Sequence, residues 1–355
     1  MHTVKRCRWA GLFFICVSLT RPAAALVTDA SVERLEASRL ALHWQATNVV
    51  DVFMADRPDA SVASSKPVSR NNGSGAVTVA VDGNARYYFI IRDRGDGSIV
   101  RTAERLVRLD QGSNFRDIGG YPAAGGKHVR WGLIYRSGAT AMLSISDLER
   151  IRALGLQQIV DLRSSEERVY APTKINGVAY SAVGYSMQEI LDALASGGTV
   201  HNAEDLYRIL PSLLAPQLHI LFSDLLRKDA PIEFNCSAGQ DRTGFATAMV
   251  LSALGTPRNV IVQDYALSTT YRQPQFEMPP IDATAHPGDP VVAMFARSAN
   301  AARKPQPLLD PQGRPFLLAA FEEIDRRWGS PEAYLQQVIG LSSIDIAELR
   351  AIYLE

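Results

Sequence analysis

Apolar and polar side chains alternate at every second position in several short runs between residues 26 and 110. A period of two is typical of β-strands with one buried face. It predicts strands at 39–44, 49–55, 76–81, 86–91 and 100–109. Clusters of Asn, Gly, Ser and Asp at 71–75 and 94–97 separate these runs as turns. We therefore expect a small all-β sandwich over 26–110, with Trp44 in its core.

From residue 111 to 355 short apolar strands alternate with stretches of helical period. Strands are predicted at 129–135, 157–162, 177–183 and 231–234, and helices at 146–154, 211–227 and 244–254. Three amphipathic helices follow at 316–328, 330–339 and 342–354. This alternation predicts an α/β layer fold with a mostly parallel central sheet.

Residues 273–315 break the pattern, because they are rich in Pro, Ala and polar residues and contain nine prolines. An irregular segment of this length is either disordered or a lid over a site. We expect the lid around 270–315, with a short helix at 291–301 inside it.

The first 25 residues have the composition of a secretory leader. Basic residues at 5, 6 and 8 precede an apolar run at 9–19, and three alanines at 23–25 form a cleavage pattern. The alternative is an uncleaved anchor, but a run of about 11 apolar residues is too short to span a bilayer. We expect removal of residues 1–25 and an exported protein, periplasmic or secreted.

Loss of this leader changes the charge and the cysteine content. The leader holds four of the 37 basic residues and none of the 37 acidic ones, so the remaining chain has a net charge near −4. Such a charge gives no reason to expect a nucleic-acid partner. Two of the three cysteines also lie in the leader, which leaves Cys236 without a disulfide partner. A lone thiol in an exported protein favours a chemical role over a structural one.

The stretch CSAGQDRTG at 236–244 follows a predicted strand and opens a predicted helix. In such a tight loop the backbone N–H groups turn inward, and the helix points its positive end at the same place, so a dianion fits there. The residues predicted to bind the phosphate are Ser237, Ala238, Gly239, Gln240, Asp241 and Arg242. The same surroundings favour the thiolate of Cys236, which is then a nucleophile toward phosphorus.

Arg242 is expected to fold back over the loop, where its planar fork holds two phosphate oxygens. Thr243 is expected to hydrogen-bond the sulfur, and Asp241 to protonate the leaving oxygen and then activate water. The alternative is a buried core cysteine with Arg242 as a surface cation, since Cys-x5-Arg spacing also arises by chance. Glycines at 239 and 244 between a strand and a helix favour the functional interpretation.

These residues resemble a known family. CSAGQDRTG is similar to the loop of cysteine-dependent protein-tyrosine phosphatases, in particular the bacterial branch typified by the secreted mycobacterial phosphatase B. Motifs of that branch recur in order at 114–120 (NFRDIGG), 133–138 (LIYRSG), 160–164 (VDLRS), 264–265 (DY) and 329–335 (GSPEAYL). The resemblance covers roughly 111–355 and implies hydrolysis of phosphotyrosine through a phosphocysteine on Cys236, with a helical lid before the last helices. Region 26–110 resembles a fibronectin type III domain, with Trp44 early and Tyr87 and Tyr88 late.

The chain departs from the family pattern at two loop positions. Asn235 stands where the family usually has His, and Gln240 where it usually has Lys. The missing Lys argues against a phosphoinositide substrate, because in the family that cation is associated with lipid-phosphate binding. Related phosphatases often supply an acidic residue from a separate loop, but 183–191 offers only Glu189. Asp241 is therefore the preferred general acid by elimination.

Under the resemblance, Arg116, Asp117 and Arg136 border the substrate pocket. The alternative is that these charges pair to hold the loop. Asp161 and Arg163, at a predicted strand end, face the same choice, with support of the fold favoured.

Three functions remain open. The first is an exported protein-tyrosine or dual-specificity phosphatase, the second a phosphoinositide or inositol-phosphate phosphatase of the same mechanism, and the third an inactive phosphate-binding or adhesion protein. Six histidines without metal-ligand spacing, and the lack of a Gly-rich nucleotide fingerprint, imply no metal and no nucleotide cofactor. No segment after the leader is long and apolar enough for membrane insertion.

Overall fold

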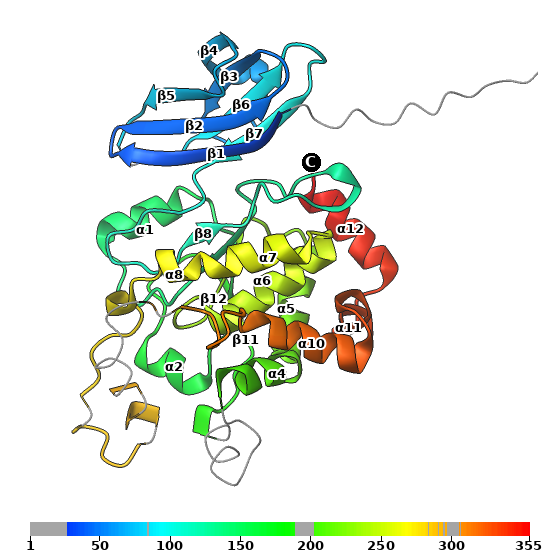
Figure 1. Ribbon diagram of the computed structural model, residues 1–355. Helices are drawn as coiled ribbons and strands as arrows, with labels where there is room; N and C mark the ends of the chain where they lie inside the picture. The colour runs from blue at the N-terminus through cyan, green and yellow to red at the C-terminus, as the bar shows by residue number, and fades with distance from the viewer. Residues whose placement is uncertain are drawn as a thin grey trace, which may run out of the picture.

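The computed structural model describes residues 27–355 except 84, 189–201, 283, 290, 294, 297–304 and 306. The predicted leader and the candidate acid Glu189 therefore lie outside the described residues, as does most of the helix expected at 291–301. Figure 1 shows an N-terminal group of strands above a larger body of helices around a second group of strands.

The N-terminal part is built from two antiparallel sheets. One has the order β1 (Val27–Glu36), β2 (Arg39–Ala46), β5 (Ala76–Ala80), and the other has the order β4 (Lys66–Asn72), β3 (Val50–Ala55), β6 (Tyr88–Asp93), β7 (Ile99–Ala103). Leu42 and Trp44 of the first sheet share a core with Val52 and Phe89 of the second. The all-β prediction is thus confirmed for 27–103, including Trp44 in the core. Strands β1 and β4 were missed, because their charged, mostly exposed residues weaken the alternation.

The larger part is organised around a mixed five-stranded sheet with the order β11 (Ala179–Ala182), β10 (Gln158–Asp161), β12 (Ile232–Asn235), β9 (Ile134–Ser137), β8 (Arg116–Asp117). The first four strands are parallel and β8 is antiparallel to β9. In this register Asn235 pairs with Asp161 on one side and Ser137 on the other. The carboxyl ends of three parallel strands therefore lie level, at the edge where α/β folds bind ligands.

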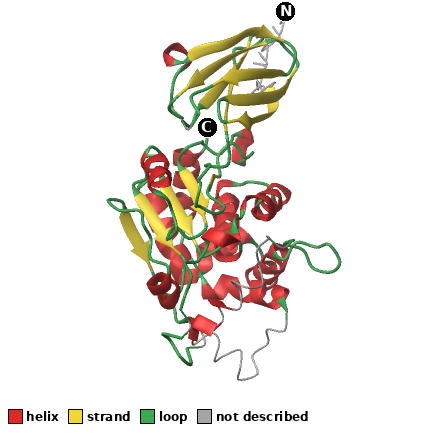
Figure 2. Ribbon diagram, turned by 90° about the vertical axis from the view of Figure 1, so that its left-hand side faces the viewer, coloured by secondary structure: helices red, strands yellow, loops and turns green. Residues whose placement is uncertain are grey.

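Helices cover both faces of this sheet (Figure 2). One face carries α4 (Ala203–Leu213), α5 (Ala215–Leu226), α6 (Asp241–Leu254), α7 (Arg258–Ala266), α10 (Leu317–Trp328), α11 (Pro331–Gln337) and α12 (Ser343–Tyr353). The other carries α1 (Ile145–Arg152), whose Ile151 packs against Tyr135 and Ile159. The central helix, α6, is apolar almost all round and follows β12 directly, so it sets the nucleophile loop on buried elements at both ends.

Two predicted elements differ from the observed ones. The helix expected at 211–227 is two helices, which meet at Leu214 and are bent by 56°. Pro216 lies in the first turn of the second helix and has no backbone N–H, so it cannot donate to the carbonyl of Ser212 and continue the hydrogen bonds of the first helix. The strand expected at 129–135 pairs only at Val129, as an isolated bridge, and from Ile134 onward. In the described part of the chain no single helix has the length and hydropathy of a membrane span; only the bent pair α4 and α5 reaches them together.

The two parts touch through a small buried contact. Trp131, which follows the first family motif, packs against Tyr88 and Ala103 of the N-terminal sheet. Its indole N–H donates to the carbonyl of Arg101 at 3.1 Å. Arg86 forms an ion pair of 2.9 Å with Asp117, which is fully buried. The N-terminal part is thus joined to the segment that leads into β8 and β9.

Candidate active site

Residues 236–240 connect β12 to α6 in a tight loop. Cys236 lies at its base and is 2% exposed. Gly239 adopts a φ of +63°, and a Cβ there would lie 2.4 Å from the backbone of Ser137. Only glycine combines that backbone conformation with so close an approach. Gly239 therefore seats the loop directly on the end of β9.

The loop presents its backbone N–H groups without internal partners. Among the described residues, no hydrogen bond uses the N–H groups of Ser237, Ala238, Gly239 or Gln240. They stand beside the first turn of α6, where the helix dipole adds positive potential. This arrangement is suited to an anion, as the spacing of the sequence predicts.

Arg242, in the first turn of α6, has a partly exposed side chain beside the loop. Its guanidinium forms a two-pronged pair with Glu167, at 2.6 and 2.7 Å, and also donates to the Tyr185 hydroxyl at 2.6 Å. Burial raises the pKa of the Glu167 carboxyl, but the charge and hydrogen bonds of Arg242 outweigh burial and lower that pKa to about 2. The arginine is thus held in a fixed orientation by a carboxylate.

The carboxylate of Glu167 comes from α2 (Ser165–Tyr170), a short helix that begins just after the strand β10 ends. Ser164 caps the helix through a capping box with Glu167, so the same side chain fixes the helix start and clamps Arg242. Ser237 of the loop also donates to Glu167, at 2.5 Å. Sequence reasoning missed Glu167 and Tyr185, although the Ser-x-x-Glu pattern after a strand was a usable signal.

Asp241 is the first residue of α6 and is partly buried. Its Oδ1 accepts hydrogen bonds from the Tyr207 hydroxyl and from the Gln240 amide. Tyr207 is buried in α4 and also contacts the hydroxyl of Tyr265 at 2.5 Å. Sequence reasoning missed Tyr207, and no local pattern marks it, because it comes from a helix about 30 residues before the loop.

Thr243 is fully buried, and its hydroxyl oxygen has no hydrogen-bond partner among the described residues. The contact with the sulfur that the sequence suggested is therefore not made in this structure. Gln240, in place of the family's Lys, accepts a hydrogen bond of 2.5 Å from Arg272. Arg272 is in turn bound by both oxygens of Glu277.

Arg116, Asp117 and Arg136 do not border an open pocket, since all three are fully buried. Arg116 and Arg136 both bind the carboxylate of Asp264, at 3.0 and 2.6 Å. Burial opposes ionisation of Asp264, but the charges of the two arginines outweigh it and hold its pKa well below the ordinary value. Asp117 faces the N-terminal part through Arg86. The prediction of pocket-lining side chains is corrected: they form buried ion pairs, though not with one another.

Arg136 supports the loop from behind, because its guanidinium donates to the carbonyl of Gly239 at 2.7 Å. Asn114 does the same from the first family motif, with its amide on the carbonyls of Ala238 and Gly239. With these carbonyls held outward, the N–H groups of the loop are free to face the opposite side. Asp161 and Arg163 form a two-pronged buried pair with each other, as the fold-support interpretation expected.

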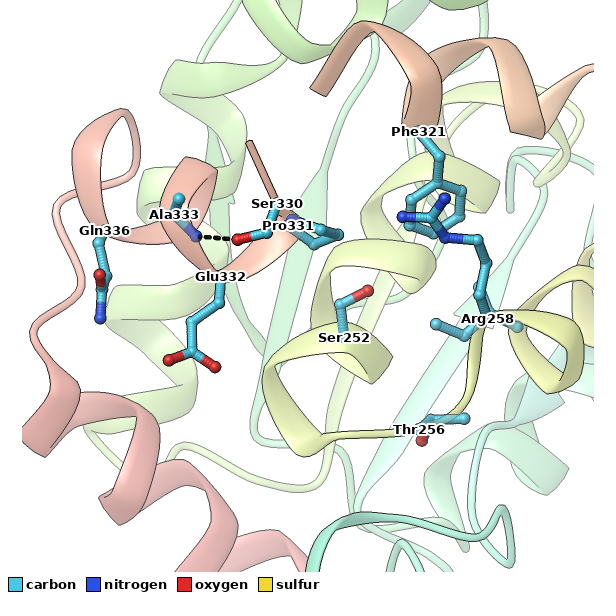
Figure 3. Close-up of a pocket in the computed structure, with 10 residues that line it drawn as sticks. Ser252, Thr256, Arg258, Phe321, Ser330, Pro331, Glu332, Ala333 and Gln336 are labelled. Atoms are coloured by element: carbon cyan, nitrogen blue, oxygen red, sulfur yellow. Dashed lines mark hydrogen bonds between the residues drawn. The ribbon is translucent and has the colours of Figure 1, made fainter. Parts of the chain in front are cut away.

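A hollow of about 490 Å³ lies elsewhere in the molecule, between the end of α6 and α11 (Figure 3). It is lined by Arg258, Phe321 and Glu332 among others, and it includes no residue of the Cys236 loop. Within the described ranges no group of three or more His, Cys, Asp or Glu side chains is placed to hold a metal ion. The end of β12 and the start of α6 bring together a thiol, an arginine and a carboxylate.

Over residues 107–355 the sequence matches the tyrosine phosphatase family. A candidate tyrosine-protein phosphatase of Cupriavidus necator is 32% identical over 256 residues, which is 70% of this chain and 88% of that protein. The triple specificity protein phosphatase PtpB of Mycobacterium tuberculosis is 28% identical over 278 residues, which is 68% of this chain and 96% of that protein.

Solved structures align more loosely. The catalytic core of Siw14 is 16% identical over 56% of this chain and 98% of its own length, with a TM-score of 0.30. TpbA of P. aeruginosa in complex with pTyr is 14% identical over 39% of this chain and 70% of its own, with a TM-score of 0.22.

Proposed function

The chain belongs to the tyrosine phosphatase family and is a protein-tyrosine phosphatase, and from this premise we propose that it works through a phosphocysteine intermediate on Cys236. The observation that carries the mechanism is the Cys236 loop itself. Its N–H groups have no partners among the described residues, and Arg242 is fixed beside them by Glu167.

In the first step the thiolate of Cys236 attacks the phosphorus of phosphotyrosine. The S–P bond forms, the P–O bond to tyrosine breaks, and Asp241 gives a proton to the departing phenolate oxygen. The three remaining phosphoryl oxygens bear the negative charge, and they accept hydrogen bonds from the N–H groups of 237–240 and from the guanidinium of Arg242. Such preorganised donors stabilise the transition state more than a flexible lysine would.

In the second step a water molecule attacks the phosphocysteine. Asp241, now ionised, takes one proton from that water, the S–P bond breaks, and inorganic phosphate leaves. The thiolate and the protonated acid are restored, so the balance is one ester and one water converted to tyrosine and phosphate. The proposal assigns the buried hydroxyl of Thr243, which makes no hydrogen bond with the sulfur in this structure, as the donor to the sulfur at this stage.

Phosphotyrosine in proteins or peptides is the substrate that this proposal favours, with phosphoserine and phosphothreonine as a possible dual specificity. The relative named a triple specificity phosphatase raises the alternative of a phosphoinositide. The loop position Gln240 contacts a cation, Arg272, but both carboxylate oxygens of Glu277 already bind that guanidinium. An uncompensated charge for an additional phosphate is thus missing at this position of the described site, and we retain the phosphoprotein as the main proposal.

We further propose that the protein is exported, after removal of residues 1–25, to the periplasm or the exterior. The support is the basic, apolar and small-residue order of the leader. Residues 26–110 would then form a separate β-domain ahead of the catalytic region 111–355. A fibronectin-like binding or spacing role is the proposal for that domain, and its ligand is left open.

The test is phosphate release by residues 26–355 from a phosphotyrosine peptide, a phosphoserine peptide and a phosphoinositide. Cys236→Ser removes the nucleophile and is expected to abolish turnover on every substrate. Arg258→Lys, a change in an exposed ion pair with Asp325 outside the loop, is the matched control and is expected to retain it. Turnover that survives Cys236→Ser would refute the phosphocysteine, and preference for the phosphoinositide would select the alternative substrate.

A further inference from the structure

Glu233 is a fully buried carboxyl that the mechanism above does not use. It lies in β12, three residues before Cys236, and its side chain is 0% exposed. Its Oε1 is 2.8 Å from the hydroxyl of Ser137 at the end of β9. A buried carboxylate is costly unless it is paired or fully hydrogen-bonded, so the protonation state of Glu233 has to be established.

The contacts of the Ser137 hydroxyl indicate this protonation state. It lies 2.8 Å from Glu233 and 2.6 Å from the carbonyl oxygen of Gly138. A hydroxyl carries one hydrogen, and a carbonyl oxygen only accepts. With Glu233 ionised, the two oxygens must share the single Ser137 hydrogen; two separate hydrogen bonds form when Glu233 is protonated and donates to Ser137, while Ser137 donates to Gly138.

The surroundings of Glu233 favour the same protonation state. Its Oε2 has no hydrogen-bond partner among the described residues, so an ionised carboxyl would leave a charged oxygen without a donor. The charged groups that face it are Asp161 and Arg163 at the end of β10, and they neutralise each other in a two-pronged pair. Tyr135 is its cross-strand neighbour on β9, and burial keeps that phenol neutral by raising its pKa. Burial likewise raises the pKa of Glu233, to about 8, with the Asp161 charge adding to the effect and Ser137 and Arg163 opposing it.

The Gly138 carbonyl connects this proton to the nucleophile loop. It belongs to the same rigid peptide unit as the N–H of Ala139. That N–H donates to the carbonyl of Ser237, the residue after Cys236, at 2.9 Å. The peptide unit is thus fixed at one end by Ser137 and at the other by the loop. Gly239 rests on the preceding peptide at the same point.

We propose that neutral Glu233 is a positioning residue for the Cys236 loop, acting through Ser137 and the Gly138–Ala139 peptide, and that its ionisation at alkaline pH loosens the loop and lowers turnover. On ionisation the carboxylate draws the Ser137 hydrogen, because charged acceptors form the stronger hydrogen bond. The Gly138 carbonyl then loses its donor, and the peptide that holds Ser237 is free to rotate. The kinetic part of this inference rests on the proposed phosphatase function.

The experiment measures kcat and KM on an aryl phosphate from pH 6 to 9.5. For each protein, kcat at pH 9 is compared with kcat of the same protein at pH 7. For the wild type, kcat at pH 9 is expected to be about tenfold below its value at pH 7, with a midpoint near pH 8, since one group with that pKa is then about nine-tenths ionised. Glu233→Gln keeps a donor to Ser137 and does not titrate, so its ratio is expected to stay within about twofold.

Asp224→Asn is the matched control. Asp224 is another buried carboxyl with a raised pKa, which arises from burial, but it bonds Gln158 and Arg227 and not the 137–139 segment. This variant is expected to keep the alkaline fall of the wild type. If Glu233→Gln keeps the same fall and midpoint, the proposal is wrong.

Two further measurements apply if Glu233→Gln does not fold or if the wild type is inactive. If Glu233→Gln does not fold, Ser137→Ala replaces it: this change removes the donor to Gly138 and is expected to lower kcat at pH 7 about tenfold and to flatten the alkaline fall. A wild-type profile from a folded Ser137→Ala would overturn the proposal. If the wild type hydrolyses no aryl phosphate, the proposed function fails instead, and binding of inorganic phosphate is compared at pH 7 and 9. A larger alkaline loss of affinity in wild type than in Glu233→Gln then supports the positioning role, and an equal loss refutes it.

Discussion

The two carboxylate oxygens of Asp241 have different surroundings. Oδ1 accepts from Tyr207 and Gln240, whereas no described residue donates to Oδ2. The tyrosine hydroxyl is itself buried and contacts Tyr265, so it fixes the orientation of the carboxyl group. Oδ2 is therefore the oxygen that is free to exchange a proton with the leaving group.

This asymmetry predicts the behaviour of Asp241→Asn. The variant retains a hydrogen-bonding side chain but has no acidic proton, and loss of a general acid lowers kcat/KM by about 10²–10⁴-fold. We expect that loss with a phosphotyrosine peptide, whose phenolate is a poor leaving group. With p-nitrophenyl phosphate, whose phenolate leaves without a proton, the loss is expected to be at least tenfold smaller. Equal losses on the two substrates would show that Asp241 is not the acid.

At this scale the sequence predicts the residues that are neighbours along the chain and misses those brought in from elsewhere. Cys236, Asp241 and Arg242 lie within seven residues of one another, so their proximity follows from their spacing in the sequence. Glu167 and Tyr207 come from α2 and α4, and their contacts depend on how distant helices pack. Arg116 and Arg136 were expected at the pocket from the family resemblance, with pairing among the charges as the alternative. Their burial depends on Asp264, 148 and 128 residues away.

Among the elements, the nucleophile loop depends most on one glycine. Gly239→Ala would place a Cβ 2.4 Å from the Ser137 backbone and hold alanine at a φ of +63°. The loop must shift to relieve that contact, and a displacement of about 1 Å in a catalytic group costs roughly 10²-fold in rate. Gly177→Ala is the control, since Gly177 has a φ of +78° and open space around its Cβ position. Steady-state kinetics should show the loss for Gly239→Ala alone; equal rates in the two variants would mean that the seat on β9 is not needed.

Glu233 in strand β12 lowers the free energy of unfolding at neutral pH. The pKa of Glu233 is raised to about 8 in the folded state, chiefly by burial, against about 4.3 in an unfolded chain. Below pH 4 Glu233 is protonated in both the folded and the unfolded chain, so it does not reduce the free energy of unfolding there. Between about pH 4.3 and 8 only the unfolded chain ionises, and stability is lost at up to about 1.4 kcal/mol per pH unit. Above pH 8 both states are ionised and the loss levels off.

Glu233→Gln does not titrate and should escape this loss. We therefore expect its free energy of unfolding, measured by urea denaturation, to rise relative to wild type from pH 5 to pH 8, by roughly 3.6 kcal/mol as an upper value. Asp147→Asn changes another buried carboxyl, which accepts three backbone N–H groups, and serves as the comparison. A constant difference between wild type and Glu233→Gln across this range would mean that Glu233 is ionised in the folded protein.

Element boundaries were predicted well where the chain itself marks them. Helix α6 ends at Leu254, as predicted, and the residue after it, Gly255, takes a left-handed conformation that ends the helix. The break between α4 and α5 was missed, because the leucines on both sides of Leu214 continue one apolar pattern across the bend. The short strand β8 was also missed, since a two-residue strand at a sheet edge leaves no period to detect.

For the whole molecule, the contact between the N-terminal sheets and the catalytic region has a charged centre. Asp117 is fully buried and receives hydrogen bonds from the backbone of Gly119 and Gly132, both 2.7 Å, and an ion pair from Arg86. Arg86 also stacks over Tyr88 and Tyr135, one from each side of the contact. Removing this cation leaves the buried Asp117 carboxyl with two backbone N–H groups and the charge of Arg105, without a salt-bridge partner.

Arg86→Met retains most of the side-chain volume and removes that cation. Breaking a buried pair from one side costs about 3–5 kcal/mol, so we expect the urea midpoint to fall by a corresponding amount. Arg92→Met is the matched control: Arg92 is 37% exposed, and its partner Asp51 keeps Arg70 and Arg94 nearby, so the expected cost is below about 1 kcal/mol. Because Trp131 lies at the contact and Trp44 in the sandwich core, their fluorescence also reports whether the two parts unfold together. Equal, small effects of both variants would show that the Arg86–Asp117 pair does not join the two parts energetically, and that the apolar packing of Trp131 on Tyr88 and Ala103 is sufficient.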